Sequence, residues 1–186
     1  MPDHAAEKGL VILDRDGVIN RDSSDFVKSP EEWIPLAGSI DAIAALSKAG
    51  FTVTVASNQS GLARGLFDQG ALAAMHQKMH DLVVAAGGHI DRVVICAHGP
   101  DDDCQCRKPK PGLLVELAEH YDVSLTGVPT IGDSLRDLQA AVAVGARPIL
   151  VRTGNGRVTE QQLPTALGVV DIFDDLAAVA AALTEA

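Results

Sequence analysis

Two aspartates stand two residues apart, directly after a short apolar segment. Asp14 and Asp16 follow 10–13, and because side chains alternate along extended backbone, both carboxylates would point to the same side. A carboxylate can attack a phosphoryl group and form an aspartyl-phosphate, which divides one difficult hydrolysis into two easier steps. The pair therefore indicates phosphoryl transfer, with Asp14 as the nucleophile and Asp16 as the general acid and base. Taken alone, the two aspartates also fit the turn and helix-capping roles that most aspartates after strands have.

Further polar residues stand where other strands are expected to end or helices to begin. Ser57 could cradle phosphate oxygens, and Lys108 could neutralise the transferring group as a point charge. Asp133 could share a Mg²⁺ ion with Asp14, since this hard cation prefers oxygen ligands and commonly uses one or two carboxylates plus phosphate. Asp137 lies one helical turn later and could support this ligand from behind. The alternative interpretation is structural: Asp133 would cap a helix, and Asp137 would be an exposed helix residue.

All three cysteines of the chain lie in one segment with a histidine. Cys96, His98, Cys104 and Cys106 fall within eleven residues, a set and spacing typical of a closed tetrahedral zinc site. Two other interpretations are reduced thiols beside a surface histidine, and a Cys104–Cys106 disulfide. The disulfide is disfavoured, because such a short bridge is strained and one thiol would stay unpaired.

Arg107 and Lys108 come directly after the last of these cysteines. A metal-bound loop would hold both cations rigidly above a phosphate site. The planar guanidinium of Arg107 could then grip a second, distal anionic group of the substrate, although an ordinary surface arginine would also fit here.

Short apolar segments alternate with helical patterns along the chain. Because strands alternating with helices imply right-handed crossovers and a mostly parallel sheet sandwiched by helices, the sequence predicts a doubly wound, Rossmann-like α/β fold. Such sheets bind ligands at the carboxyl ends of their strands. The longest irregular stretch, 18–38, is expected to rim the site. The expected strands are 10–13, 51–56, 92–95, 129–131 and 148–151, and the expected helices are 39–48, 68–86, 111–120, 134–144 and 174–183.

The composition restricts the possible partners. The chain has 186 residues, of which 47% are hydrophobic and 22% charged, and its formal net charge is −10. This indicates a single domain over 1–186, with a zinc-binding loop at 96–106. A nucleic-acid partner is disfavoured, because the net charge repels phosphate backbones and 3% aromatic residues leave few stacking platforms. No apolar run approaches the about 18 residues of a membrane span, and residues 1–9 do not fit a signal peptide. We therefore expect a cytoplasmic monomer that acts on a small substrate.

Four segments in order carry a resemblance to a known family. The segments 14–18 (DRDGV), 57–59 (SNQ), 108–109 (KP) and 132–134 (GDS) resemble the four motifs of the haloacid dehalogenase superfamily. This resemblance implies a magnesium-dependent phosphatase, with Mg²⁺ held by Asp14, the main-chain carbonyl of Asp16 and Asp133. Little room is left between the motifs for the cap domains that many members carry, so the chain resembles the capless type.

The stretch 58–65 (NQSGLARG), together with the cysteine loop, narrows the resemblance to zinc-loop phosphatases of this superfamily that act on a heptose bisphosphate. It implies hydrolysis of the C7 phosphate of a heptose 1,7-bisphosphate, a step toward ADP-heptose and the lipopolysaccharide core. Histidinol-phosphate phosphatases are the nearest alternative, but they usually carry Asp where this chain has Ser60. A non-catalytic phosphate-binding protein is opposed by the presence of both Asp14 and Asp16. The implied substrate contacts are Asp22, Ser23, Ser24, Asp25, Ser57, Asn58, Gln59, Ser60, Arg107, Lys108 and Ser134.

Two further patterns receive a structural interpretation. His76 and His80 stand four residues apart, but no third ligand follows them, and a solvated helix face is the expected role. The segment 154–156 (GNG) is expected to be a turn.

Overall fold

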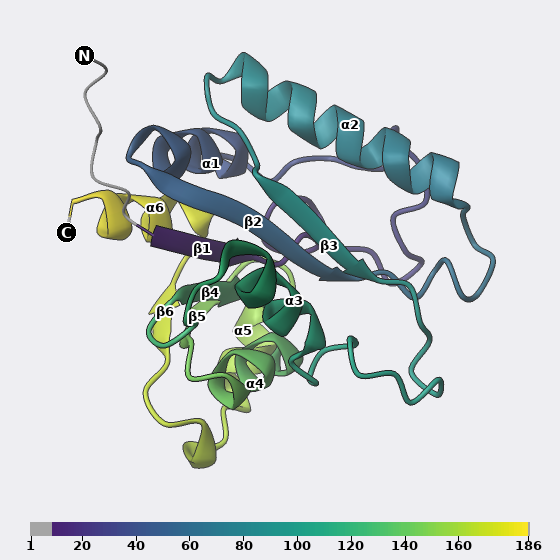
Figure 1. Cartoon of the computed structure of the whole chain (residues 1–186). Coiled ribbons are helices and arrows are strands. Elements are labelled where there is room, and N and C mark those ends of the chain that lie inside the picture. The colour runs from purple at the N-terminus through teal and green to yellow at the C-terminus, as the bar shows by residue number, and fades with distance from the viewer. Residues whose placement is uncertain (1–8, 186) are drawn as a thin grey trace.

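The strands form one six-stranded parallel sheet in the order β3-β2-β1-β4-β5-β6 (Figure 1). The structure is a computed structural model that describes residues 9–185. The absence of a signal peptide was expected from residues 1–9, of which 1–8 lie outside the described part. The elements are β1 (Gly9–Leu13), α1 (Ser39–Lys48), β2 (Phe51–Asn58), α2 (Gln69–Ala85), β3 (Arg92–Cys96), α3 (Gly112–Tyr121), β4 (Pro129–Gly132), α4 (Leu135–Ala143), β5 (Arg147–Val151), α5 (Gly156–Gln161), a 3₁₀ helix (Thr165–Leu167), β6 (Asp171–Phe173) and α6 (Leu176–Thr184).

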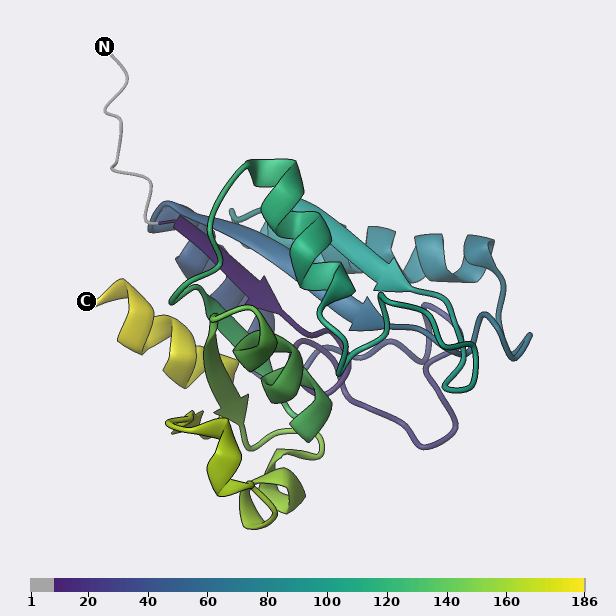
Figure 2. The ribbon, with the colours of Figure 1, turned by 60° about the horizontal axis from the view of Figure 1, so that its bottom comes forward.

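Helices cover both faces of the sheet, and each face has its own core. Along β1, Val11 and Leu13 point to the face covered by α1, α2 and α6, while Leu10 and Ile12 point to the face covered by α3 and α4. This alternation follows from the two-residue period of extended backbone. Figures 1 and 2 show the sheet between these two helical layers. The arrangement confirms the predicted doubly wound α/β fold.

The register brings three chemically important positions to one edge of the sheet. In β1, Leu13 pairs with Val55 of β2 and with Ile131 of β4. The residues that follow these pairs therefore leave the same edge, which is the carboxyl edge where parallel sheets bind ligands. Strand β2 continues further and pairs Asn58 with Cys96. This pairing starts the cysteine loop directly beside the end of β2.

The expected strands and helices all occur, with ends within two residues of the expected ones. The sequence did not predict β6, α5 or the 3₁₀ helix. Strand β6 has three half-buried residues at the edge of the sheet, and helix α5 has six residues. Both are too short to show the apolar periodicity on which the other expectations depend.

The irregular stretch 18–38 is held against α2 and lines the pocket at the carboxyl edge. Trp33 is fully buried in the core to which α1, α2 and α6 contribute. Lys78 Nζ of α2 donates to the carbonyls of Pro30 (2.7 Å) and Trp33 (2.8 Å). Phe26 adopts a left-handed backbone (φ 64°) at the turn that faces the site. Within residues 9–185, no helix is both long and apolar enough to cross a membrane.

Candidate active site

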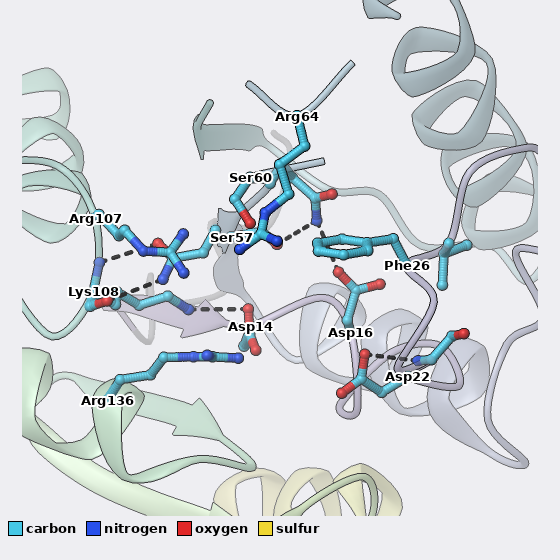
Figure 3. A pocket seen from close by; sticks show the side chains of 14 residues that line it. Asp14, Asp16, Asp22, Phe26, Ser57, Ser60, Arg64, Arg107, Lys108 and Arg136 are labelled. Atoms are coloured by element: carbon cyan, nitrogen blue, oxygen red, sulfur yellow. Dashed lines mark hydrogen bonds and ion pairs between the residues drawn. The ribbon is translucent and has the colours of Figure 1, made fainter. Parts of the chain in front are cut away.

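A polar pocket of about 230 Å³ opens at the carboxyl edge of β1 and β2 (Figure 3). Its walls come from the segment after β1, the long loop, the segment after β2, the end of the cysteine loop and the first turn of α4. The lining residues are Asp14, Asp16, Asp22, Ser23, Phe26, Val27, Ser57, Asn58, Gln59, Ser60, Arg64, Arg107, Lys108 and Arg136.

Lys108 connects two buried carboxylates at the base of the pocket. Its Nζ lies 2.9 Å from Asp14 Oδ1 and 2.6 Å from Asp137 Oδ1, and it donates to the Ala56 carbonyl at 2.8 Å. Burial and the nearby negative charge of Asp137 raise the pKa of Asp14 to about 8. Burial alone would lower the pKa of Lys108, but the Asp137 and Asp14 carboxylates raise it above its ordinary value. The lysine therefore stays charged beside the carboxylate expected to attack phosphorus.

The Asp16 carboxylate is fixed by three neighbouring side chains. Arg15, which is fully buried, donates to both of its oxygens at 2.9 and 3.0 Å. Asn20 Nδ2 donates to Oδ1 at 2.8 Å, and Gln59 Nε2 donates to Oδ2 at 2.8 Å. Burial would raise the pKa of Asp16, but the Arg15 guanidinium and these hydrogen bonds hold it below its ordinary value. In this arrangement Asp16 is held as an ionised carboxylate.

Asp133 lies below the pocket, in a space that only glycine neighbours allow. Side-chain Cβ atoms on Gly17, which has a φ of +86°, or on Gly154 would collide with Asp133 Oδ2. The backbone and side-chain amides of Asn155 donate to this oxygen at 2.7 and 3.1 Å. Burial and the charge of Asp137 raise the pKa of Asp133 to about 6.

The oxygens of Asp14, Asp133 and Asp137 approach within 4.8 Å of one another, and all three residues are buried. So dense a group of buried carboxylates is electrostatically unfavourable unless cations compensate it. Lys108 supplies one positive charge. Hard oxygen ligands in such a cluster suit Mg²⁺, so the residues present fit this ion.

Two polar side chains after β2 hold parts of the site together. Asn58 Oδ1 accepts from the backbone N–H of Lys108, and its Nδ2 donates to the Lys108 carbonyl, both at 3.0 Å. Gln59 Nε2 also donates to Ser57 Oγ at 2.9 Å. The Ser57 hydroxyl can therefore donate its own proton toward the pocket.

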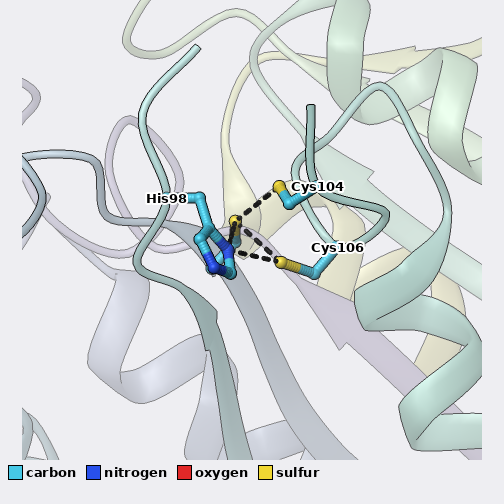
Figure 4. A group of neighbouring side chains, drawn as sticks. His98, Cys104 and Cys106 are labelled. Atoms are coloured by element: carbon cyan, nitrogen blue, oxygen red, sulfur yellow. Dashed lines mark hydrogen bonds between the residues drawn. The ribbon is translucent and has the colours of Figure 1, made fainter. Parts of the chain in front are cut away.

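The three cysteines and His98 form a compact cluster beside the pocket (Figure 4). The Sγ atoms of Cys96 and Cys106 lie 2.9 Å apart, and Cys106 Sγ lies 3.2 Å from His98 Nδ1. All three cysteines are free, so the alternative of a disulfide is not what the structure contains. Burial raises the pKa of the Cys96 thiol to about 12, so this sulfur needs a bound cation to become a thiolate. Three sulfurs and an imidazole are a donor set that fits Zn²⁺.

The expected site residues do not all lie at the pocket. Ser24 and Asp25 are exposed and do not line it; Ser24 lines a separate cavity with Asn155. Ser134 Oγ donates to Asp137 Oδ2 at 2.5 Å and caps α4 rather than facing the pocket. Conversely, four lining residues were not among the site residues expected from the sequence, namely Phe26, Val27, Arg64 and Arg136. The NQSGLARG stretch contains Arg64, but nothing in its spacing marked the residue as part of the site.

His76 differs from the expected solvated histidine. Its Nε2 lies 3.3 Å from Arg15 Nη1, on the opposite side of that guanidinium from Asp16. Burial, together with the positive charge of Arg15, lowers the pKa of His76 to about 4. The neutral ring therefore supports Arg15 from behind. His80, by contrast, is exposed, as expected.

Comparisons with known proteins define the class. A family model described as HAD-hydrolase-like matches residues 105–179, and one described as polynucleotide kinase 3 phosphatase matches residues 10–133. The sheet and the carboxylate pair at its carboxyl edge agree with these matches. Fold and site therefore define a phosphomonoester hydrolase of the haloacid dehalogenase superfamily.

Curated relatives and a solved structure define the family within this class. The chain is 55% identical to a D-glycero-beta-D-manno-heptose-1,7-bisphosphate 7-phosphatase of Pseudomonas aeruginosa, over 96% of this chain and 99% of the relative. It is 57% identical to the protein of that name from Bordetella bronchiseptica, over 95% and 98% of the two chains. A crystal structure of D,D-heptose 1,7-bisphosphate phosphatase from B. bronchiseptica, complexed with magnesium and phosphate, matches with a TM-score of 0.92 and 56% identity over 95% of this chain and 98% of that one. The chain belongs to this family of heptose bisphosphate phosphatases.

Proposed function

We propose that this protein hydrolyses the C7 phosphate of D-glycero-β-D-manno-heptose 1,7-bisphosphate, the substrate in the names of its relatives, on the route to ADP-heptose and the lipopolysaccharide core. The observation that carries this proposal is the identity of 55% or more to phosphatases of that name over nearly the whole chain. The pocket supports it, because Asp14 and Lys108 lie at its base and arginines stand on its rim.

The side chains of the pocket suit a two-step phosphoryl transfer. Asp14 attacks phosphorus, and the bond from phosphorus to the C7 oxygen breaks. Asp16, which is ionised in the free site, first takes up a proton from solvent and gives it to that oxygen. Asp16 then takes a proton from water, which attacks the aspartyl-phosphate and releases inorganic phosphate. Lys108 and the Ser57 hydroxyl offset the charge on the phosphoryl oxygens throughout.

Two metal ions belong to the proposal. Asp14, the main-chain carbonyl of Asp16 and Asp133 would hold Mg²⁺, which supplies positive charge that reduces the repulsion between the Asp14 carboxylate and the phosphate. Cys96, His98, Cys104 and Cys106 would hold a structural Zn²⁺ ion. The zinc loop is tied to the pocket through the two hydrogen bonds between Asn58 and the Lys108 backbone.

The proposed setting is the cytoplasm, with the protein acting as a monomer of one domain. Free thiols in the cysteine cluster suit a reducing compartment. The large apolar side chains exposed within residues 9–185 come from separate loops and helices, including Leu66, Val84, Val142 and Val158. Light scattering on the purified protein tests the monomer.

A comparison of substrates tests the proposed activity. With Mg²⁺, kcat/KM for the heptose 1,7-bisphosphate should exceed that for histidinol phosphate by at least about a hundredfold, near 2.7 kcal/mol of transition-state discrimination. An oligonucleotide with a 3′-phosphate belongs in the same panel, because one matching family model is that of a polynucleotide phosphatase. Asp14→Asn should abolish turnover of every substrate. Wild-type turnover in that variant, or a preference for either rival substrate, contradicts the proposal.

A further inference from the structure

Three arginines that line the pocket form no salt bridge with a carboxylate of the described residues. Among the described residues, Arg15, Arg92, Arg147 and Arg152 each form ion pairs with carboxylates, whereas Arg64, Arg107 and Arg136 form none of these pairs. In a chain of net charge −10, three unpaired guanidinium groups at one pocket indicate an anionic ligand larger than one phosphate.

Arg107 and Arg136 share one wall of the pocket, while Arg64 stands on another. Figure 3 shows the Arg107 and Arg136 guanidinium groups on either side of Lys108. Both arginines also line the adjoining cavity, which extends from the pocket along the cysteine loop. That cavity is also lined by two lysines, and both are paired: Lys108 with Asp14 and Asp137, and Lys110 with Asp103 at 2.7 Å. Arg64 is instead stacked over the Phe26 ring, 5.5 Å from its centroid.

Arg136 lies on the exposed side of α4, and the groups at the base of the pocket meet the buried side of that helix. The next residue, Asp137, points inward and pairs with Lys108. Because successive residues of an α-helix differ by about 100° in direction, Arg136 is turned toward the exposed rim. Arg107 donates one long hydrogen bond within the protein, from its Nη1 to the His98 carbonyl at 3.4 Å. Most of its N–H donors therefore remain available to a ligand.

We propose that Arg136 is a specificity-determining residue which, together with Arg107, binds the phosphate of the bisphosphate that is not transferred. This inference rests on the proposed function and assigns Arg136 a role in it. Two planar forks on one wall give bidentate contacts to an anion. The same pair repels the cationic amine of histidinol phosphate, so it favours one substrate and disfavours the other.

The test compares Arg136→Gln with Arg157→Gln on two substrates. Arg157 is exposed on α5 and lines none of the described pockets that contain Arg136, so its variant is the matched control. The substrates are the heptose 1,7-bisphosphate and the heptose 7-phosphate, which lacks the distal phosphate. Arg136→Gln should lower kcat/KM for the bisphosphate by about 10- to 100-fold, mainly through KM, because one charge-assisted contact is lost. Its kcat/KM for the monophosphate should stay within about twofold of wild type, as should both values for Arg157→Gln.

The outcomes separate this inference from the proposed function. An equal loss on both substrates places Arg136 at the transferring phosphate or in folding, and overturns the inference. No loss on either substrate also overturns it. A wild-type enzyme with no preference for the bisphosphate over the monophosphate overturns the inference, and so does a wild-type preference that survives in Arg136→Gln. Neither result touches the proposed function, which is contradicted only by a preference for histidinol phosphate or the oligonucleotide or by wild-type turnover in Asp14→Asn.

Discussion

The buried pair of Lys108 and Asp137 predicts a strong energetic coupling. Both side chains are almost fully buried, 4% and 3% exposed, and their charged atoms lie 2.6 Å apart. Removing one partner leaves the other charge buried without compensation, at a cost of about 3 to 5 kcal/mol of unfolding free energy. Lys108→Met should lose about that much. Asp137→Asn should lose about 2 kcal/mol, because Asp14 still neutralises Lys108.

The double variant should be little less stable than Lys108→Met alone. Once the lysine is absent, the Asp137 charge is itself unfavourable, and Asp14 can take up a proton because its pKa is already near 8. The coupling energy should therefore be about 2 kcal/mol.

Urea unfolding at pH 7 of the wild type, both single variants and the double variant measures this coupling. The exposed pair Lys110 and Asp103, at 2.7 Å, gives a matched control that should show no measurable coupling, since solvent screens it. If the two buried changes add within about 0.5 kcal/mol, the ion pair is not what stabilises this site and the reasoning is refuted. Lys108→Met should also lower kcat by about 100- to 1000-fold, because the positive charge beside the phosphoryl group is lost.

Two other perturbations follow from the structure. The pKa of His76 is about 4 in the fold against 6.5 for a free histidine, so the unfolded chain binds a proton that the fold does not, and stability falls as pH drops from 6.5 toward 4. Between pH 7 and pH 5, wild type should lose about 1 to 2 kcal/mol more than His76→Gln in urea unfolding; identical pH dependence in both would contradict a neutral, buried His76. Removal of the metal with a chelator, or Cys96→Ser, should lower Tm by at least about 5 °C and should also lower kcat/KM. The reason is that the loop before Lys108 is then no longer held by the bound zinc ion. Metal analysis of the purified protein should find one zinc per chain, and its absence would contradict the assignment.

The sequence predicted those site residues that local spacing places at strand ends. Asp14, Ser57 and Asp133 each follow an apolar run, and parallel strands necessarily bring such positions to one edge. The cysteine cluster could likewise be predicted, because its four side chains lie within one short loop. The sequence pattern was sufficient in these cases because the chemistry is local or fixed by the sheet.

Other positions could not be predicted, because tertiary contacts create them. Asn155 donates to Asp133 across 22 residues of chain, whereas its segment, 154–156, was expected only to form a turn. His76 contacts Arg15 across 61 residues of chain, although the sequence pattern predicted that its helix face is solvated. Ser134 shows the opposite case, since its motif position indicated a substrate contact while its hydroxyl is bonded to Asp137. In each case the helix or turn was predictable, and its orientation against the sheet decided the role.

The charge arrangement explains how an acidic chain accommodates an anionic substrate. At physiological salt the Debye length is about 8 Å, so the net charge of −10 acts weakly on a phosphate already inside the pocket. The charged groups nearest to the phosphate determine the electrostatic potential inside the pocket. The carboxylates of Asp16 and Asp137 are neutralised by Arg15 and Lys108, while the arginines of the rim keep their charge for a ligand. It follows that activity should depend more on Arg107 and Arg136 than on the overall charge, and that neutralising distant surface acids should leave KM nearly unchanged.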